Sequence, residues 1–355
     1  MNNKPFTSGY QAPEEIKEIE TKPYHLQPNG SVTSSIKTVL EYTKKKGRTP
    51  RGNKDLKVTT NKSLLGNTEI NFKSRNTDII ISIENYEEIA TRQDKNTIKI
   101  FNFLLQKSNE QNHNTDIKFH LEELVKNGMY KSLDTARKGF KNSMEKIKKI
   151  EIEGSIKKGK KEVRSKKGYL FYDRDINNSF VTVKRNETMG IEFIAQYITL
   201  IPIWAYQLKE KSYSLIDYIF YRARQEITNI KEKGYYNMSL ESINNHLGQP
   251  TPEETKRHSE EIINPILEAI TEIEDLQNKN AITDFKITPI FEEGTAQQFL
   301  QGYLKIELLD KSKTYFIERA VNKENEIKKT IAKIEKNKLQ KTLKKDEKEE
   351  PKKPL

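Results

Sequence analysis

The sequence has 355 residues, no cysteine and a formal net charge of +12, with 32% charged residues. The lack of cysteine excludes disulfide bonds and thiolate metal sites, and no apolar run of about 18 residues could cross a membrane. A chain of this length normally forms two domains. Its basic balance favours a nucleic-acid partner, although it also suits an acidic membrane surface or a ribosome. We expect a cytoplasmic location, because no signal-peptide pattern opens the chain.

Residues 1–76 contain scattered Pro, Gly, Asn, Ser and Thr, and this composition predicts a largely disordered arm. A basic stretch lies within it. Such an arm either enters a minor groove or contacts phosphates loosely, and the second behaviour is the commoner one for basic tails. The candidate contacts of this basic arm are Lys44, Lys45, Lys46, Arg48 and Arg51.

The first predicted domain covers residues 77–185. Apolar residues at helical spacing predict a helix over 94–107 and a short second helix that ends at Gly128. A third helix follows Ser132, a good N-cap residue, and alternating residues then predict strands at 150–156, 169–171 and 180–183. This order is typical of a winged-helix domain, in which the third helix enters the major groove. The outward positions expected to contact DNA are Ser132, Thr135, Arg137, Lys138, Lys141 and Asn142.

A dense basic cluster lies between the predicted strands and is expected to form the tip of the wing. The residues between positions 157 and 167 include seven cations and one acid, Glu162. An ordinary solvated loop mixes both signs of charge, so phosphate contact is the favoured interpretation over a solubilising loop. The cations are Lys157, Lys158, Lys160, Lys161, Arg164, Lys166 and Lys167.

A linker at 186–198 leads to the second predicted domain, 199–312, which repeats the same order. Helices are expected at 215–227 and 239–247, and a long one from Pro252 that Pro265 should kink or divide. Strands are expected at 285–290 and 302–308. Residues 251–276 hold eight acids and two bases. Only Lys256 and Arg257, near the start of the long helix, therefore look suited to DNA.

With two such units in order, the chain resembles plasmid replication initiators of the tandem winged-helix type, the iteron-binding Rep family. The resemblance is carried by residues 200–276, including LIPIWAYQLKEKSYSLIDYIFYRARQEI, SLESINNHLGQPTPEE and INPILEAITEIEDL. It implies binding to repeated duplex sites at a plasmid origin, local duplex opening, recruitment of host replication proteins, and homodimers that repress. The acidity of the second unit departs from this pattern and leaves open whether that unit binds DNA or protein.

Catalytic motifs are absent from the sequence. The five histidines never take the paired spacing of a metal-dependent strand transferase, and no phosphate-binding loop is present. We therefore expect no enzyme activity, cofactor or metal. The alternatives are a transcriptional repressor, a scaffold protein and a DNA nuclease with an unrecognised site.

The expected fold is α+β and mostly helical. It consists of two tandem winged-helix domains with a flexible basic N-terminal arm and a charged C-terminal helix and tail at 313–355.

Overall fold

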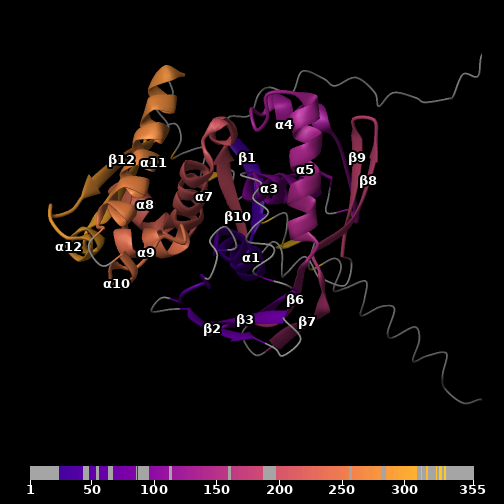
Figure 1. Ribbon diagram of the computed structural model, residues 1–355, viewed down its shortest axis with the longest axis horizontal. Helices are drawn as coiled ribbons and strands as arrows, with labels where there is room; N and C mark the ends of the chain where they lie inside the picture. Colours follow the sequence, from indigo (N-terminus) through magenta and orange to yellow (C-terminus); the bar gives the residue numbers. More distant parts are fainter. Residues whose placement is uncertain are drawn as a thin grey trace, which may run out of the picture.

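The computed structural model describes residues 24–42, 48–52, 56–62, 67–84, 86, 96–111, 114–158, 161–186, 197–255, 258–280 and 285–309, with seven further positions between 313 and 332. Within these residues the chain is an α+β protein whose strands pair into four antiparallel sheets. Figure 1 shows the indigo to magenta elements on one side and the orange elements on the other. No described helix is long and apolar enough to cross a membrane.

The first unit combines three helices with a three-stranded sheet. Edge-to-face ring contacts join its elements: Phe103 to Phe119 at 5.0 Å and Phe119 to Phe140 at 5.5 Å between centroids. These rings are buried, so the helices close one face of the sheet. The sheet order is β5-β9-β8. The elements are α3 (Thr97–Glu110), β5 (Asp116–His120), α4 (Leu121–Lys126), α5 (Leu133–Ile147), β8 (Phe171–Asn177) and β9 (Phe180–Arg185).

The second unit repeats this arrangement, because its sheet has the equivalent order β11-β13-β12. The helix predicted from Pro252 is two helices, which separate before residue 260. Pro265 lies within the second of them, near its start, and does not divide it. The elements are α7 (Glu210–Gln225), α8 (Ile227–Lys233), β11 (Tyr235–Ser239), α9 (Leu240–His246), α10 (Pro252–Thr255), α11 (Glu260–Lys279), β12 (Phe285–Ile290), α12 (Ala296–Gln301) and β13 (Tyr303–Leu308).

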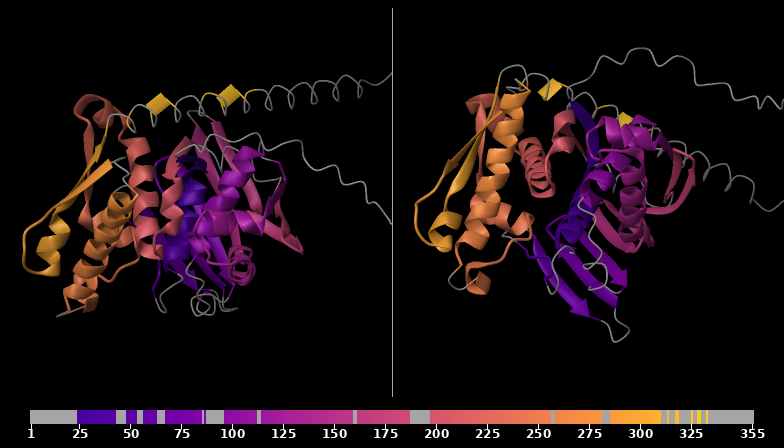
Figure 2. Two further views of the ribbon diagram at one scale, coloured as in Figure 1. Left: turned by 90° about the horizontal axis from the view of Figure 1, so that it is seen from above. Right: turned by 45° about the horizontal axis from the view of Figure 1, so that its top comes forward.

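The prediction that 1–76 is a largely disordered arm is wrong for much of its length. Ile70 and Phe72 are buried at alternate positions of one strand, and Ile79, Ile81 and Ile83 are buried at alternate positions of the next. These strands join a five-stranded sheet of order β2-β3-β4-β6-β7. Figure 2 shows this sheet at a distance from the orange strands of the second unit. The new elements are α1 (Ser31–Tyr42), β2 (Lys57–Lys62), β3 (Asn67–Lys73), β4 (Thr77–Glu84), β6 (Ile150–Lys158) and β7 (Lys161–Tyr169).

A two-stranded sheet lies between the two units. Its strands are β1 (Tyr24–Asn29) and β10 (Tyr197–Pro202), so the N-terminal segment pairs with residues from the predicted linker and the start of the second domain. The short helix η1 (Ile203–Gln207) then leads into α7. β1 packs on α3, and β10 packs on α7. The N-terminal strand therefore joins the units. Residues 187–196 of the predicted linker lie outside the described residues.

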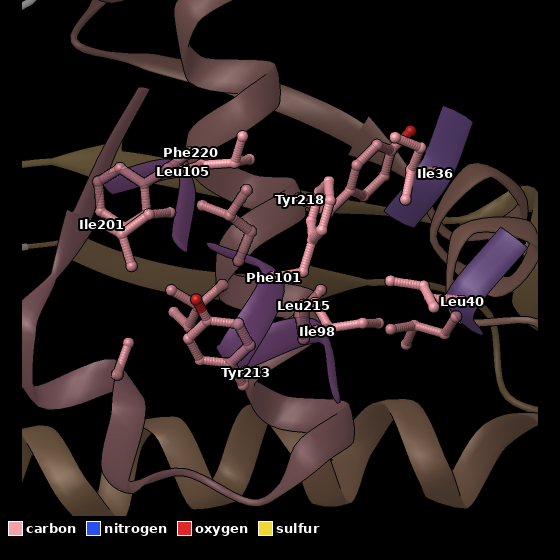
Figure 3. Close-up of a cluster of buried hydrophobic side chains, with 14 of the residues drawn as sticks. Ile36, Leu40, Ile98, Phe101, Leu105, Ile201, Tyr213, Leu215, Tyr218 and Phe220 are labelled. Carbon is pink, nitrogen blue, oxygen red and sulfur yellow. The ribbon is translucent and has the colours of Figure 1, made fainter. Parts of the chain in front are cut away.

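The junction has a continuous apolar part. Figure 3 shows that helices α1, α3 and α7 and strand β10 direct side chains into one cluster. Because the cluster draws on both units, separating them would expose apolar surface to water. Its labelled members are Ile36, Leu40, Ile98, Phe101, Leu105, Ile201, Tyr213, Leu215, Tyr218 and Phe220.

A buried polar network runs through the same junction. The Lys37 ammonium lies 3.0 Å from Asp217 Oδ2. The Gln27 side chain donates to Asn102 at 3.1 Å and to Asp217 at 3.4 Å, and Asn102 donates to Tyr213 Oη at 2.9 Å. These five residues come from β1, α1, α3 and α7, and all are buried. The network thus fixes how the units pack, because displaced buried polar groups would lose their partners.

His25 in β1 makes this junction sensitive to acid. Its ring packs against Tyr206 with centroids 5.6 Å apart. Burial lowers the pKa of His25 from 6.5 to about 4, outweighing the opposing effect of the Glu110 carboxylate. An unfolded histidine binds a proton below about pH 6.5, so the unfolded state holds more protons in this window. The contribution of His25 to the free energy of unfolding is therefore complete above about pH 6.5 and decreases as the pH falls toward 4.

We expect this one group to remove about 2 kcal/mol of unfolding free energy between pH 7 and pH 5. Urea unfolding of the wild type and of His25→Gln at both pH values measures the effect. The variant should lose less stability than the wild type by that amount, and equal losses in the two proteins would contradict the assignment.

Candidate nucleic-acid interface

Helix α5 presents a polar face to solvent, and its apolar face is buried. Ala136, Phe140, Met144 and Ile147 are at most 2% exposed and pack inward. The Ser132 side chain accepts a hydrogen bond from the Thr135 N–H and caps the helix start. The helix is therefore held by its core side while its outer side is largely exposed. The exposed side chains on that side are Ser132, Thr135, Lys138, Lys141 and Asn142, as predicted.

The hairpin of the first unit turns at Asn178, which adopts a left-handed conformation with φ of 55°. Arg137 on α5 donates from Nη2 to the Asn178 carbonyl at 2.9 Å. The same hairpin is tied to α5 by Arg174, 2.7 Å from Glu145. The turn is thus fixed beside α5. Arg137 was predicted to face bases or phosphates. In the structure its guanidinium holds the turn at Asn178 beside α5.

Glu145 is held ionised in this arrangement. Its partial burial opposes ionisation, but hydrogen bonds from Arg174 and Lys148 outweigh that effect and lower the pKa of Glu145. Lys148 lies 3.2 Å from the same carboxylate. The end of α5 therefore carries paired charges, and its exposed cations, Lys138 and Lys141, lie nearer the start.

The basic cluster at 157–167 does not form the turn beside α5, which corrects the prediction of a basic wing tip. It forms a long hairpin of the five-stranded sheet, in which Ile156 pairs with Val163 and Lys158 with Lys161. The strands extend through the cluster because inward apolar residues such as Ile152 and Ile156 continue into it. The turn residue Lys160 lies outside the described residues, as do the side chains of Lys158 and Lys161. The exposed described cations are Lys157, Arg164, Lys166 and Lys167.

Two of these cations have acidic partners. Arg164 lies 3.1 Å from Glu162, and Lys167 lies 3.0 Å from Glu151. The hydrogen bond that Lys167 donates to Glu151 raises the pKa of Lys167. Arg164 and Lys167 are both exposed, so each cation can exchange its acidic partner for an external anion.

Gly154 allows the close approach of β6 to β4. A Cβ at this position would lie 2.8 Å from the Asp78 carbonyl oxygen and 3.2 Å from Ile79 Cα, both backbone atoms. We expect Gly154→Ala to lower the free energy of unfolding by about 1–3 kcal/mol, because a strand must move. Ser155→Ala is the control and should change it by about 0.5 kcal/mol or less. Thermal unfolding measures both, and equal midpoints for the two variants would refute the steric argument.

Part of the predicted basic arm contacts the second unit. Arg48 Nη1 donates to the Gly248 carbonyl at 3.2 Å, and Arg51 Nη2 donates to the Gln249 carbonyl at 2.5 Å. Arg51 also lies 3.5 Å from Glu254. These guanidinium groups thus bind the turn after α9 in the described structure, where the prediction had a free arm. Lys44, Lys45 and Lys46 lie outside the described residues.

The second unit offers a different surface. The exposed side chains of α11 include Glu260, Glu261, Glu268 and Asp275. Lys256 and Arg257, the cations predicted to contact DNA, lie outside the described residues. The connection between β12 and β13 contains α12, which packs on α9 and α11. The helix equivalent to α5 is therefore acidic and partly covered at its start.

A cleft of about 1150 Å³ lies between the units. Glu268, Glu272 and Asp275 of α11 form one wall, and Lys131 lies on the side of the first unit. Glu272 accepts bonds from the Lys209 N–H at 2.9 Å and from Ser212 Oγ at 2.6 Å. Four lysines also line the cleft, Lys99, Lys131, Lys209 and Lys211, so its acidic and basic side chains are balanced in number. Among the described residues, no group of three acidic or histidine side chains could hold a metal ion.

Sequence comparison found no matching family model and no matching curated protein. Two solved structures are similar in shape, both of RctB domains 2 and 3. The first, of a selenomethionine derivative, has 10% identity and a TM-score of 0.44, and the match covers 78% of this chain and 98% of that one. The second has 11% identity and a TM-score of 0.39, with coverage of 79% and 99%. Scores at this level do not establish a common fold.

The sequence did not reveal the turn at Asn178 as part of this surface, nor Lys73 and Arg75, which are exposed together with Lys57 on the five-stranded sheet. The turn carries no charge, so composition gives no signal for it. The three cations stand in a segment whose composition indicated disorder. The alternation of buried Ile70 and Phe72 with polar residues was a local signal for the strand that carries Lys73.

Proposed function

We propose that this protein binds duplex DNA through its first unit, in the manner of a winged-helix module. The single observation that carries the proposal is the exposed polar face of α5 beside a turn that Arg137 fixes to it. A helix and an adjacent hairpin turn held together can contact a major groove and its flanking backbone at once. The repeated sheet order of both units supports the assignment of two winged-helix modules.

In this proposal the residues divide into two roles. Thr135 and Asn142 can donate to and accept from base edges, and Lys138 and Lys141 suit bases or phosphates. The cations of the β6–β7 hairpin suit the backbone, which carries no sequence information. Arg137 acts through the turn that it holds. Ser132 caps the recognition helix and remains exposed at its start.

Selection of bound sequences from random duplex DNA tests this function. Recovery of one motif, and an affinity that falls steeply with salt, are the expected results. Contact with about eight phosphates would give a slope near −7 for log affinity against log salt. A slope near zero, or no enrichment, would remove the proposal.

Replication initiation is the more specific role that we propose, on the resemblance of residues 200–276 to plasmid initiators. Supercoiled DNA that contains the selected motif in repeats should then become reactive toward a single-strand-specific reagent when the protein binds. A repressor would leave the duplex closed. We also propose that the protein is not a nuclease, in which case incubation with plasmid and Mg²⁺ leaves the supercoils intact.

A protein-binding role for the second unit is a further candidate, favoured by the acidic face of α11. Glu268 and Asp275 would repel phosphates but suit a basic protein surface. In this view the second unit serves a homodimer contact or a host replication protein. Glu268→Lys with Asp275→Lys should then weaken self-association, measured by sedimentation, or the capture of a basic partner protein. If both are unchanged while the affinity for the selected motif falls, the unit contacts DNA through this face and the protein-binding role fails.

A further inference from the structure

The outer face of the five-stranded sheet is divided by charge along the strands. At one end, next to the β3–β4 turn and the tip of the β6–β7 hairpin, the exposed charged residues are mostly basic. We call this end the basic row, and it consists of Lys57, Lys73, Arg75, Lys157 and Arg164. At the other end the charged residues include Glu69, Glu84, Glu151 and Glu153.

Strand register places Lys57, Lys73 and Arg164 of the basic row on one face and in one line. Lys57 pairs with Lys73, and Lys73 pairs with Asp78. Asp78 pairs with Ser155, which pairs with Arg164. Cross-strand partners share a face, so this line crosses all five strands at right angles. Lys157 is fixed close to it, because its N–H donates to the Asn76 carbonyl beside Arg75.

The basic row carries five cations, and the described acids paired with them are two, Asp78 beside Lys73 and Glu162 beside Arg164. Like charges directly opposite each other, as Lys57 and Lys73 are, destabilise a strand pair. Asp78 is the acid in the line, and it lies 3.6 Å from Lys73. Lys73 stays 65% exposed and Arg164 stays 77% exposed. An external anion would therefore relieve the repulsion with little loss of existing contacts.

The spacing suits a phosphate backbone. Neighbouring strands lie about 4.8 Å apart, so Lys73 and Arg164, three strands apart, are separated by about 14 Å. That distance is close to the width of the major groove of B-DNA, about 12 Å. Lys73 and Arg164 can therefore meet the two backbones that border one groove. The acids farther along the strands exclude DNA from the rest of the face.

We propose that the basic row is a second DNA-contact surface, which binds the phosphate backbone to one side of the site contacted by α5. The inference rests on the proposed DNA-binding function. β6 begins two residues after the C-cap of α5. The hairpin reaches about 26 Å from its first residue to its tip, at about 3.3 Å per residue. The contact therefore falls within one duplex turn of that site, on the side toward which the end of α5 points.

The test uses three duplexes. One is the selected motif alone, and the other two extend it by about 12 base pairs, one on each side. This extension is longer than the reach of the hairpin. The variant is Lys57→Gln with Lys73→Gln and Arg75→Gln, whose side chains are exposed and outside the core. The control is Lys231→Gln with Lys233→Gln and Lys279→Gln, three exposed lysines of the second unit. Circular dichroism establishes that each is folded.

The wild type and the control should bind one extended duplex about tenfold more tightly than the motif alone, with a salt slope steeper by about 3. The other extension should bring no gain. The variant should bind all three duplexes equally. A gain retained by the variant, or gains from both extensions, would overturn the inference while leaving the proposed function intact. Failure of the wild type to bind any of the duplexes would instead defeat the proposed function.

Should the variant fail to fold, Lys157→Gln with Arg164→Gln provides the same comparison from the other end of the line. Vesicles of anionic phosphatidylserine test the other phosphate surface. If the wild type binds them and the variant does not, while the variant keeps the length dependence on DNA, the basic row is a membrane contact and is rejected as a DNA contact.

Discussion

Replacing Asp217 by alanine is expected to lower the free energy of unfolding by about 3–5 kcal/mol. The carboxylate is 3.0 Å from the Lys37 ammonium, and both side chains are at most 4% exposed. Burial lowers the pKa of Lys37, while the Asp217 carboxylate opposes that effect. Without Asp217 the ammonium would remain buried with no counter-ion, or would lose its proton. Urea unfolding measures the loss as a lower midpoint.

Two comparisons separate the lost ion pair from lost packing. Lys37→Met with Asp217→Leu removes both charges and should recover most of the stability, because a buried ion pair is often replaceable by apolar residues. Glu162→Gln breaks an exposed pair with Arg164 and should change the free energy of unfolding by about 1 kcal/mol or less. A loss below that value for Asp217→Ala would contradict the buried-pair argument.

The same network makes the two units dependent on each other. Gln27 of β1 donates to both Asn102 of α3 and Asp217 of α7, one residue from each unit. β1 also pairs with β10, which leads into the second unit. We therefore expect the wild type to unfold in one transition, since neither unit can leave the junction without exposing polar groups that have lost their partners.

The helices of the first unit could be predicted because their periodicity is local. Ile98, Phe101 and Leu105 recur at helical spacing, and all three are buried in α3. Ser132 was expected to cap α5 and does so. In these cases a few neighbouring residues determine the element, so the sequence contains the full signal.

The sheet partners could not be predicted, because they depend on distant residues. Tyr24 pairs with Pro202, although nothing near Tyr24 indicates this strand. β7 was hidden for another reason: its residues are mostly charged, and a bulge between Ile152 and Gly154 interrupts its register with β6. A lysine-rich strand at the edge of a sheet resembles a loop in composition, and lysines there also prevent pairing with other chains.

The candidate site shows the same limit. The outward residues of α5 follow from its buried face, and most of them are exposed as expected. The turn at Asn178 has no charge and was overlooked, while the basic cluster drew the prediction to a hairpin in another sheet. Charge density identifies surfaces that suit phosphates, but only pairing shows which hairpin lies beside the helix.

Charge reversal on α5 should have the largest effect on DNA binding. We expect Lys138→Glu with Lys141→Glu to weaken binding to the selected motif by about 100-fold or more, since each lost contact costs about 1–3 kcal/mol and each new acid repels phosphates. Both side chains are exposed and lie opposite the buried face of α5. The free energy of unfolding should therefore change by about 0.5 kcal/mol or less. Fluorescence anisotropy with labelled duplex measures the affinity.

The matched control for this pair is Lys231→Glu with Lys233→Glu, which makes the same change of net charge on α8 of the second unit. If α5 is the recognition helix, the control should weaken binding to the motif and to unrelated DNA alike, and by far less than the α5 variant. The α5 variant should lose more affinity for the motif than for unrelated duplex, because base contacts are lost together with phosphate contacts. Equal losses for the two variants would mean that net charge alone accounts for binding, and α5 would then not be the element that reads the sequence.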